Sequence, residues 1–409
     1  MKYKNEIVLT VVLSLLIVTL KWINVLQIKN LFLMILFILG CSTLAVFLQQ
    51  KLDKHYTQNE INYHNLDILK YVSAVLIIIL HLRPFFNYSV SLDLAFNNII
   101  TRVCVPLFFV ITGYFVGVKE KKYPEYIKQY ISKTIPLYLV WSALYIPIII
   151  EVAIRYYPTV QGYVDLVPLP LPMIILILLI LSPIIIFISL IYSGVYYHLW
   201  YFPAVMLSLW TLKKWKERFQ VKYLLLISFF LLLFGATETY YGVLPFSIRH
   251  LIDFYYKIFF TTRNFLFFGL FYIVLGYCMG QKEKLYSEHC ISKLIVSMFC
   301  LVFEAIILQH FHRLNSNILL SCIPLTYYLF IFTLYITKQK EKRIHFSYRE
   351  FSKYYYLVHP AIITLCFYVF KIISKQTDPY IQLVVVLFFT HITSYFFMFI
   401  KRRYPKLPI

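Results

Sequence analysis

Residues 65–84 read N-L-D-I-L-K-Y-V-S-A-V-L-I-I-I-L-H-L-R-P. The stretch predicts an apolar helix with Asp67 and Lys70 near one end and His81 near the other. Lys70 and His81 lie close to three helical turns apart, so both side chains project from nearly the same stripe, about 16 Å apart. Charge inside a membrane helix is costly and usually functional, so the pair indicates a candidate site. Alternatively, both are interfacial anchors, with the lysine snorkelling and the histidine at head-group depth.

The whole chain has the composition of a membrane protein. Of its 409 residues, 61% are hydrophobic and only 14% are charged, which lies well outside the range of soluble domains. Many separate apolar runs predict an all-α polytopic integral membrane protein, because lipid admits only helices or closed barrels. The runs fall at 7–26, 31–48, 66–82, 102–118, 134–154, 171–192, 197–212, 221–241, 263–280, 294–312, 318–337, 354–374 and 380–400.

The basic loops predict the topology. The net charge is +21, and the lysines and arginines cluster in short loops between the runs, so topology explains them better than nucleic-acid binding does. Placing these loops inside makes 119–133 cytoplasmic and 83–101 external. This topology holds only if the run 171–192 does not cross the membrane as a single span, since otherwise the later basic loops would lie outside. Because that run is interrupted by Pro183, we expect a re-entrant or interfacial hairpin there, with about twelve spans in the plasma membrane and both termini cytoplasmic.

Residues 1–60 are predicted to form two additional N-terminal transmembrane helices that precede a membrane domain over 61–409. None of the seven cysteines forms a C-x-x-C pair, so the sequence supports neither a disulfide framework nor a metal site. We expect no bound cofactor and no covalent serine or cysteine nucleophile. Glu304 lies in the middle of an apolar run, where its carboxylate requires a partner.

Polar residues open several of the later runs. Arg102 precedes V-P-L-F-F-V-I-T-G-Y over 105–114, and 198–201 read H-L-W-Y. Arg263 and Asn264 stand together at the start of another run, and 356–360 read Y-L-V-H-P. Taken alone, the H-L-W-Y cluster is also typical of an aromatic belt, and the histidine before the proline is also typical of a kink whose freed carbonyl is capped.

The order of these landmarks over about residues 65 to 370 resembles the membrane-bound acyltransferase 3 family. That family carries a basic residue, ten intervening residues and a histidine, followed by comparable later motifs. Thr112 stands where the family usually has serine, which keeps a hydroxyl. The segments L-D-I-L-K and Y-H-L-W-Y-F also resemble the membrane portion of membrane-bound serine racemases, whose racemase domain we do not find in this sequence.

The resemblance implies an acyltransferase that O-acetylates an envelope glycan from cytoplasmic acetyl-CoA. His81 would be the general base, since imidazole titrates near neutral pH. Lys70 would hold the donor, or be paired by Asp67 one turn earlier. The expected substrate-binding residues are Arg102, His198, Trp200, Arg263, Asn264 and His359.

A multi-pass transporter or flippase is the main alternative, because it needs the same buried polar residues. Only ten glycines and no clear inverted repeat argue mildly against it. A receptor or scaffold would not explain the order of landmarks from Lys70 to His359. A parallel repeat is also visible, since 111–123 and 274–286 share seven residues, and Gly113 and Gly117 form a small-x-x-x-small packing ridge.

Overall fold

The computed structural model describes residues 63–152, 170–283, 285, 287–336, 347–373 and 378–409. All regular elements within these ranges are helices, as predicted. The two N-terminal helices predicted for 1–60 lie outside the described residues.

The long helices are α3 (Tyr63–Leu82), α5 (Cys104–Glu120), α6 (Tyr126–Leu144), α8 (Leu171–Tyr192), α9 (Tyr201–Lys216), α10 (Val221–Ala236), α11 (Phe246–Phe259), α12 (Leu270–Gln281), α13 (Cys290–Leu308), α14 (Cys322–Tyr335), α15 (Tyr348–Ile373) and α16 (Pro379–Arg403). Short elements are α4 (Val90–Asp93), the π-helices η1 (Leu94–Ile99) and η4 (Phe265–Gly269), and the 3₁₀ helices η2 (Ile100–Val103) and η3 (Tyr241–Val243). Each apolar run from 66–82 onward contains a helix.

Several of these helices can cross a bilayer. Five described segments are long and apolar enough, namely α3, the continuous stretch Val90–Glu120, α13, α15 and α16. A sixth is α6 together with Ile146–Val152, which are bent by 43° relative to one another. Helices α10 and α14, and η4 with α12, are apolar but shorter than the roughly 20 residues that a straight span needs. The class of a multi-helix membrane protein is confirmed, whereas the count of about twelve spans stays a prediction.

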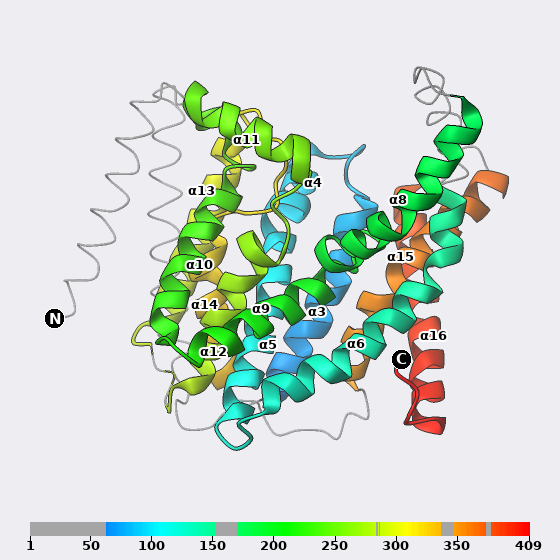
Figure 1. Cartoon of the computed structure of the whole chain (residues 1–409). Helices are drawn as coiled ribbons and strands as arrows, with labels where there is room; N and C mark the ends of the chain where they lie inside the picture. Colours follow the sequence, from blue (N-terminus) through cyan, green and yellow to red (C-terminus); the bar gives the residue numbers. More distant parts are fainter. Residues whose placement is uncertain (1–62, 153–169, 284, 286, 337–346, 374–377) are drawn as a thin grey trace.

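The hairpin expected at 171–192 is wrong, because α8 is one continuous helix. Pro172 lies in the first turn, where a missing N–H leaves no bond unmade. Pro183 removes one bond from the interior, whereas reversing the chain in an apolar medium would leave several backbone groups unpaired. Helices α8 and α9 follow one another from one end of the bundle toward the other, separated by a break at 193–200 (Figure 1).

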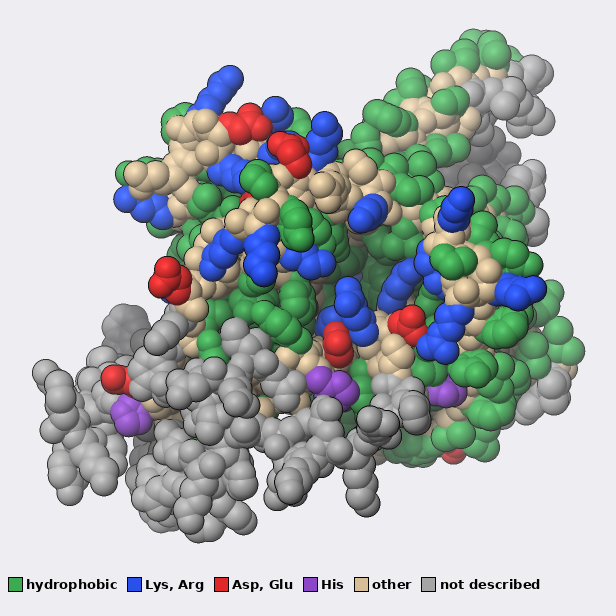
Figure 2. Space-filling view, turned by 90° about the horizontal axis from the view of Figure 1, so that it is seen from below, with side chains coloured by type: hydrophobic (Ala, Val, Ile, Leu, Met, Phe, Trp, Pro, Cys, Tyr) green, Lys and Arg blue, Asp and Glu red, His purple; other side chains and the backbone are tan. Residues whose placement is uncertain are grey.

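The basic loops lie together at one end of the molecule. Lys213 and Lys216 at the end of α9 pair with Glu125 and Glu120, at 2.8 and 2.5 Å. The Lys213 ammonium lowers the pKa of the exposed Glu125 carboxyl below its usual value. The ends of α5 and α16 also reach this end of the bundle (Figure 1), and Lys and Arg side chains gather on it (Figure 2). The shared placement is confirmed for the basic loops that the structure describes, whereas the one at 338–343 lies outside the described residues. That this end faces the cytoplasm stays a prediction.

Helices α5 and α12 pack in parallel through glycines on both. A Cβ on Gly113 would lie 2.2 Å from the Ile273 carbonyl oxygen, and one on Gly276 would lie 2.2 Å from that of Val110. The predicted repeat aligns Gly113 with Gly276 and Val110 with Ile273, so each of these two contacts is the counterpart of the other. The segments that resemble one another in sequence therefore pack against each other around a local two-fold relation.

Glu304 has the partners that its depth requires. Its carboxylate accepts from the backbone N–H groups of Leu320 and Ser321, at 2.7 and 2.8 Å, and from the hydroxyl of Tyr240. The two N–H groups lie just before α14, so the carboxylate satisfies donors at the start of that helix. Glu304 is thus explained by the fold, not by the candidate site.

Candidate functional site

Three irregular segments converge inside the bundle. They are the stretch before α5, which includes η1 and η2, the break between α8 and α9, and the turn that leads into η4. Irregular backbone at membrane depth is tolerated where it lines a cavity, and single-turn π-helices are frequent at functional sites. Two clusters of buried side chains flank the convergence, one around α5 and α12 and the other around α3, α6 and α15.

A cavity of about 80 Å³ lies where the three segments meet. It is bordered by Trp200 and Phe268 from the first cluster, and by Phe108 and Tyr356, which pack against the second. Its polar and aromatic lining includes His81, Thr101, Arg102, Tyr197, His198, Trp200, Tyr201, Arg263, Asn317 and Tyr356. Five of the predicted site residues therefore share one cavity, namely His81, Arg102, His198, Trp200 and Arg263.

Local geometry sets the positions of the lining residues. Gly194 in the break has φ +73°, a conformation that favours glycine, and a Cβ there would lie 2.6 Å from the backbone nitrogen of Trp200. Before η2, Arg83 pairs with Asp93 at 2.6 Å, and Asn97 donates to the same carboxylate at 2.6 Å. This ties down the segment that ends in Arg102.

Three histidines cluster beside the cavity. The ring of His81 stacks on His359, with centroids 5.5 Å apart and planes at 19°, and the His198 ring lies 5.8 Å from His359. Neither ring nitrogen of His198 makes a hydrogen bond of good geometry within the described residues. Three side chains from α3, α15 and the α8–α9 break thus meet, although they are far apart in the sequence.

The protonation pattern of His359 follows from its surroundings. The ring is fully buried, and Nδ1 lies 2.8 Å from the carbonyl oxygen of Tyr355, one turn earlier in α15. A carbonyl only accepts, so the proton of the neutral ring is on Nδ1 and Nε2 is left as an acceptor. Nε2 has no hydrogen-bond partner in the described part of the chain. His359 therefore donates to a carbonyl of its own helix and stacks on His81. The carbonyl that Pro360 frees is that of Tyr356, four residues earlier, so this bond is not the cap that the kink reading predicts.

Two arginines supply positive charge to the cavity. Arg102 donates through Nε to the Asn97 carbonyl at 2.6 Å, and Arg263 lies over the Trp200 ring with its guanidinium carbon 5.3 Å from the centroid. Neither arginine forms a salt bridge with a described carboxylate. Their charge is available to a bound group.

Besides His359, two predicted residues lie outside the lining. Lys70 forms an ion pair with Asp67 at 2.7 Å, which is the pairing expected from their spacing. The Asn264 side chain caps η4, since Oδ1 accepts from the N–H groups of Leu266 and Phe267 at 2.9 and 3.1 Å. Substrate contact by Asn264 and donor contact by Lys70 stay predictions.

Several lining residues were not expected from the sequence. Tyr356 donates to the carbonyl of His198, which ties α15 to the α8–α9 break. Tyr201 contacts the Thr112 hydroxyl at 2.9 Å, so the hydroxyl noted at position 112 holds a cavity residue in place. Tyr201 ends the H-L-W-Y motif and Tyr356 opens the Y-L-V-H-P motif, so both belong to landmarks of the sequence although neither was predicted to line the site.

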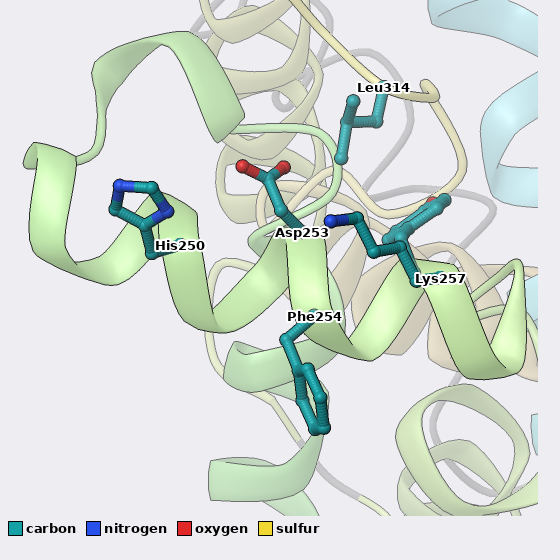
Figure 3. A pocket seen from close by; sticks show the side chains of 6 residues that line it. His250, Asp253, Phe254, Lys257 and Leu314 are labelled. Atoms are coloured by element: carbon teal, nitrogen blue, oxygen red, sulfur yellow. The ribbon is translucent and has the colours of Figure 1, made fainter.

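A second hollow lies on α11, which crosses one end of the bundle (Figure 1). It is lined by His250, Asp253, Phe254, Tyr256, Lys257 and Leu314. Figure 3 shows Asp253 and Phe254 on opposite sides of the helix. Asp253 accepts a hydrogen bond from Tyr241 at 2.8 Å, and none of the predicted site residues lines this hollow. We therefore place the candidate site in the cavity lined by His81, Arg102 and Arg263.

Comparison with known proteins agrees with the family resemblance of the sequence. A family model described as an acyltransferase domain matches residues 63–399, which is most of the chain. The chain belongs to the acyltransferase 3 family. All five residues that share the cavity fall inside the matched range. This acyltransferase 3 protein is a membrane protein, as its family and its apolar helices show.

The protein also resembles longer bacterial proteins. An amino-acid racemase from Enterococcus faecalis is 32% identical over 263 residues, which are 62% of this chain and 33% of that protein. A serine/alanine racemase from Enterococcus gallinarum is 24% identical over 354 residues, which are 83% of this chain and 46% of that protein. The chain thus spans between a third and a half of the length of these relatives. No solved structure matches the acyltransferase 3 chain.

Proposed function

We propose that this protein transfers a short acyl group, such as acetyl, from cytoplasmic acyl-CoA to a hydroxyl of an envelope glycan or related acceptor. The observation that carries the proposal is the convergence of His81, Arg102 and Arg263 on one cavity within the range that matches the family model. At about 80 Å³ the cavity is small, which suits a short acyl group.

The proposed chemistry uses residues that the cavity brings together. His81 accepts the proton of the acceptor hydroxyl while that oxygen attacks the thioester carbonyl carbon. The tetrahedral oxyanion is stabilised by Arg102 or Arg263. The C–S bond then breaks, the ester is released, and the coenzyme A thiolate takes the proton from His81. His359, stacked on His81, positions that imidazole.

The donor would approach from the basic end. Lys70 lies toward that end of α3, with its Nζ 5.8 Å from the centre of the Phe115 ring. A cation there suits the phosphates of coenzyme A. The racemase activity in the names of the relatives is not extended to this chain, because the matches cover only 33–46% of those proteins.

The test is acyl transfer by the purified full chain in liposomes. Labelled acetyl-CoA is supplied on one side and crude envelope glycans on the other, and label is followed into alkali-labile ester on the glycan. The proposal expects label in the glycan fraction from wild type and none from His81→Gln. Passage of intact glycan or small solute across the liposome, without ester formation, would instead support the transporter alternative.

A further inference from the structure

The charge of the cavity is unbalanced. Arg102 and Arg263 line it, and none of its described lining residues is an aspartate or glutamate. Arginine stays protonated in proteins. An unpaired charge in a buried site is expensive, so such a site is stable when an anion completes it.

The nearest compensation comes from Glu238, and it is incomplete. Glu238 is fully buried and acts electrostatically on Arg263. Its Oε2 accepts from the backbone nitrogen and hydroxyl of Thr262, at 2.9 and 2.5 Å, and its Oε1 accepts from Asn317 at 2.6 Å. One negative charge beside two guanidinium groups leaves a net positive charge at the cavity.

Both guanidinium groups also retain N–H donors that no described residue accepts. Among the described residues, Arg102 makes one contact beyond its bond to Asn97, a long one of 3.4 Å to Asn98, although it carries five N–H groups. The contact of Arg263 to the Tyr197 carbonyl is 3.5 Å. Donors in this fork geometry match the paired oxygens of a carboxylate or phosphate.

We infer that the cavity binds a carboxylate or phosphate group carried by the acceptor, close to the hydroxyl that is acylated. The inference rests on the proposed function. The oxyanion of the transfer step is transient and does not balance the charge of the resting site. The phosphates of coenzyme A are separated from its thioester by the long pantetheine arm, so they lie far from a cavity in which the thioester reacts.

The test measures anion binding apart from catalysis. The thermal unfolding midpoint of the full chain in detergent is followed with acetate, with its neutral isostere acetamide, and with inorganic phosphate, each at constant ionic strength. We expect saturable stabilisation by acetate, phosphate or both, and none by acetamide. Equal stabilisation by acetamide, or no saturable effect of either anion, overturns the inference.

Single-residue variants test whether the anion binds at the cavity. Arg102→Gln and Arg263→Gln are expected to raise the half-saturating anion concentration at least about tenfold, since charge-assisted hydrogen bonds are lost. Arg403→Gln, at the exposed end of α16, is the matched control and should bind as wild type does. If a glutamine variant does not fold, the corresponding lysine variant keeps the charge and should bind more weakly than wild type. Unchanged binding in both cavity variants means adsorption elsewhere and overturns the inference.

The two proposals can fail separately. Anion binding that needs both arginines, without acyl transfer to any acceptor, would support the anion site and contradict the acyltransferase proposal. Acyl transfer without specific anion binding would support the acyltransferase proposal and contradict the anion site. A preference for acetate over phosphate assigns a carboxylate-bearing acceptor, and the opposite preference assigns a phosphorylated one.

Discussion

His81 is the residue on which the proposed chemistry depends most. Replacing it with glutamine should abolish acyl transfer, because a general base contributes about 10²–10⁴-fold to rate. Insertion should be unaffected, since residues 71–80 of α3 are largely apolar and removing a titratable group eases burial. The rate of labelled ester formation is compared with that of His250→Gln, whose side chain lies in the hollow on α11. A well-folded His81→Gln protein with wild-type rate would contradict the assignment.

Lys70 allows a sharper test because of its partner. If its charge holds the donor, Lys70→Ala should raise the KM for acetyl-CoA, by about tenfold if one charged contact is lost. Lys70→Arg should retain part of the affinity. Asp67→Asn breaks the 2.7 Å ion pair but keeps the cation, so donor binding should survive. Equal loss in Lys70→Ala and Asp67→Asn would mean that the pair is structural.

At the scale of single residues, the sequence identified candidate side chains better than it identified the groups that they contact. The Lys70–Asp67 pair was predictable, because residues one turn apart meet on a helix. The stacking of His81 on His359 was not, since it depends on which faces of α3 and α15 meet. Glu304 shows the same limit: its depth predicted a partner, but the donors come from the start of another helix. Hydrophobic periodicity defines which face of each helix is buried, but it does not determine which helix packs against that face.

The α5–α12 contact is the element most sensitive to added volume. Gly276→Ala would place a methyl group 2.2 Å from the Val110 carbonyl oxygen, so the helices must separate. Overpacking of this kind costs about 1–3 kcal/mol, and a lower unfolding midpoint in detergent is expected. Ala143→Val on the exposed side of α6 adds more volume without this cost and serves as the control. An unchanged midpoint in Gly276→Ala would show that the contact is looser than described.

Elements were predictable where the pattern is local. Helices fall in every described apolar run, and the small-residue ridge on α5 marks its packing face. The prolines of 171–192 led to the wrong prediction of a hairpin, because Pro172 lies at the start of a helix and Pro183 is tolerated within it. The break at 193–200 carries the candidate residues His198 and Trp200 instead. The π-helices η1 and η4 have no signature in hydrophobic periodicity. Yet η4 contributes Phe268 to the cavity, and η1 leads directly into η2, which contributes Thr101 and Arg102.

At the scale of the whole molecule, the basic residues and the candidate site lie toward opposite ends of α3. The basic end holds the ion pairs between α9 and the ends of α5 and α6, and Lys70 lies toward it. His81 lies about 16 Å farther along the axis, near the segment 83–101. An acyl group carried on a long thioester arm from the basic end would therefore reach the cavity, whereas the acceptor would enter from the other end.

That arrangement predicts a specific orientation in the membrane. By the charge of the loops, Ser91 before η1 faces outside and Tyr123 between α5 and α6 faces the cytoplasm. Both positions are exposed, so a cysteine placed at either one can react. In a background whose seven native cysteines are replaced, an impermeant thiol reagent added to intact cells should label Ser91→Cys and not Tyr123→Cys. Permeabilised cells should show labelling of both, which is the control for reactivity. Labelling of Tyr123→Cys alone in intact cells would invert the protein and place His81 on the side of the donor, so transfer to an external acceptor would no longer follow from the structure.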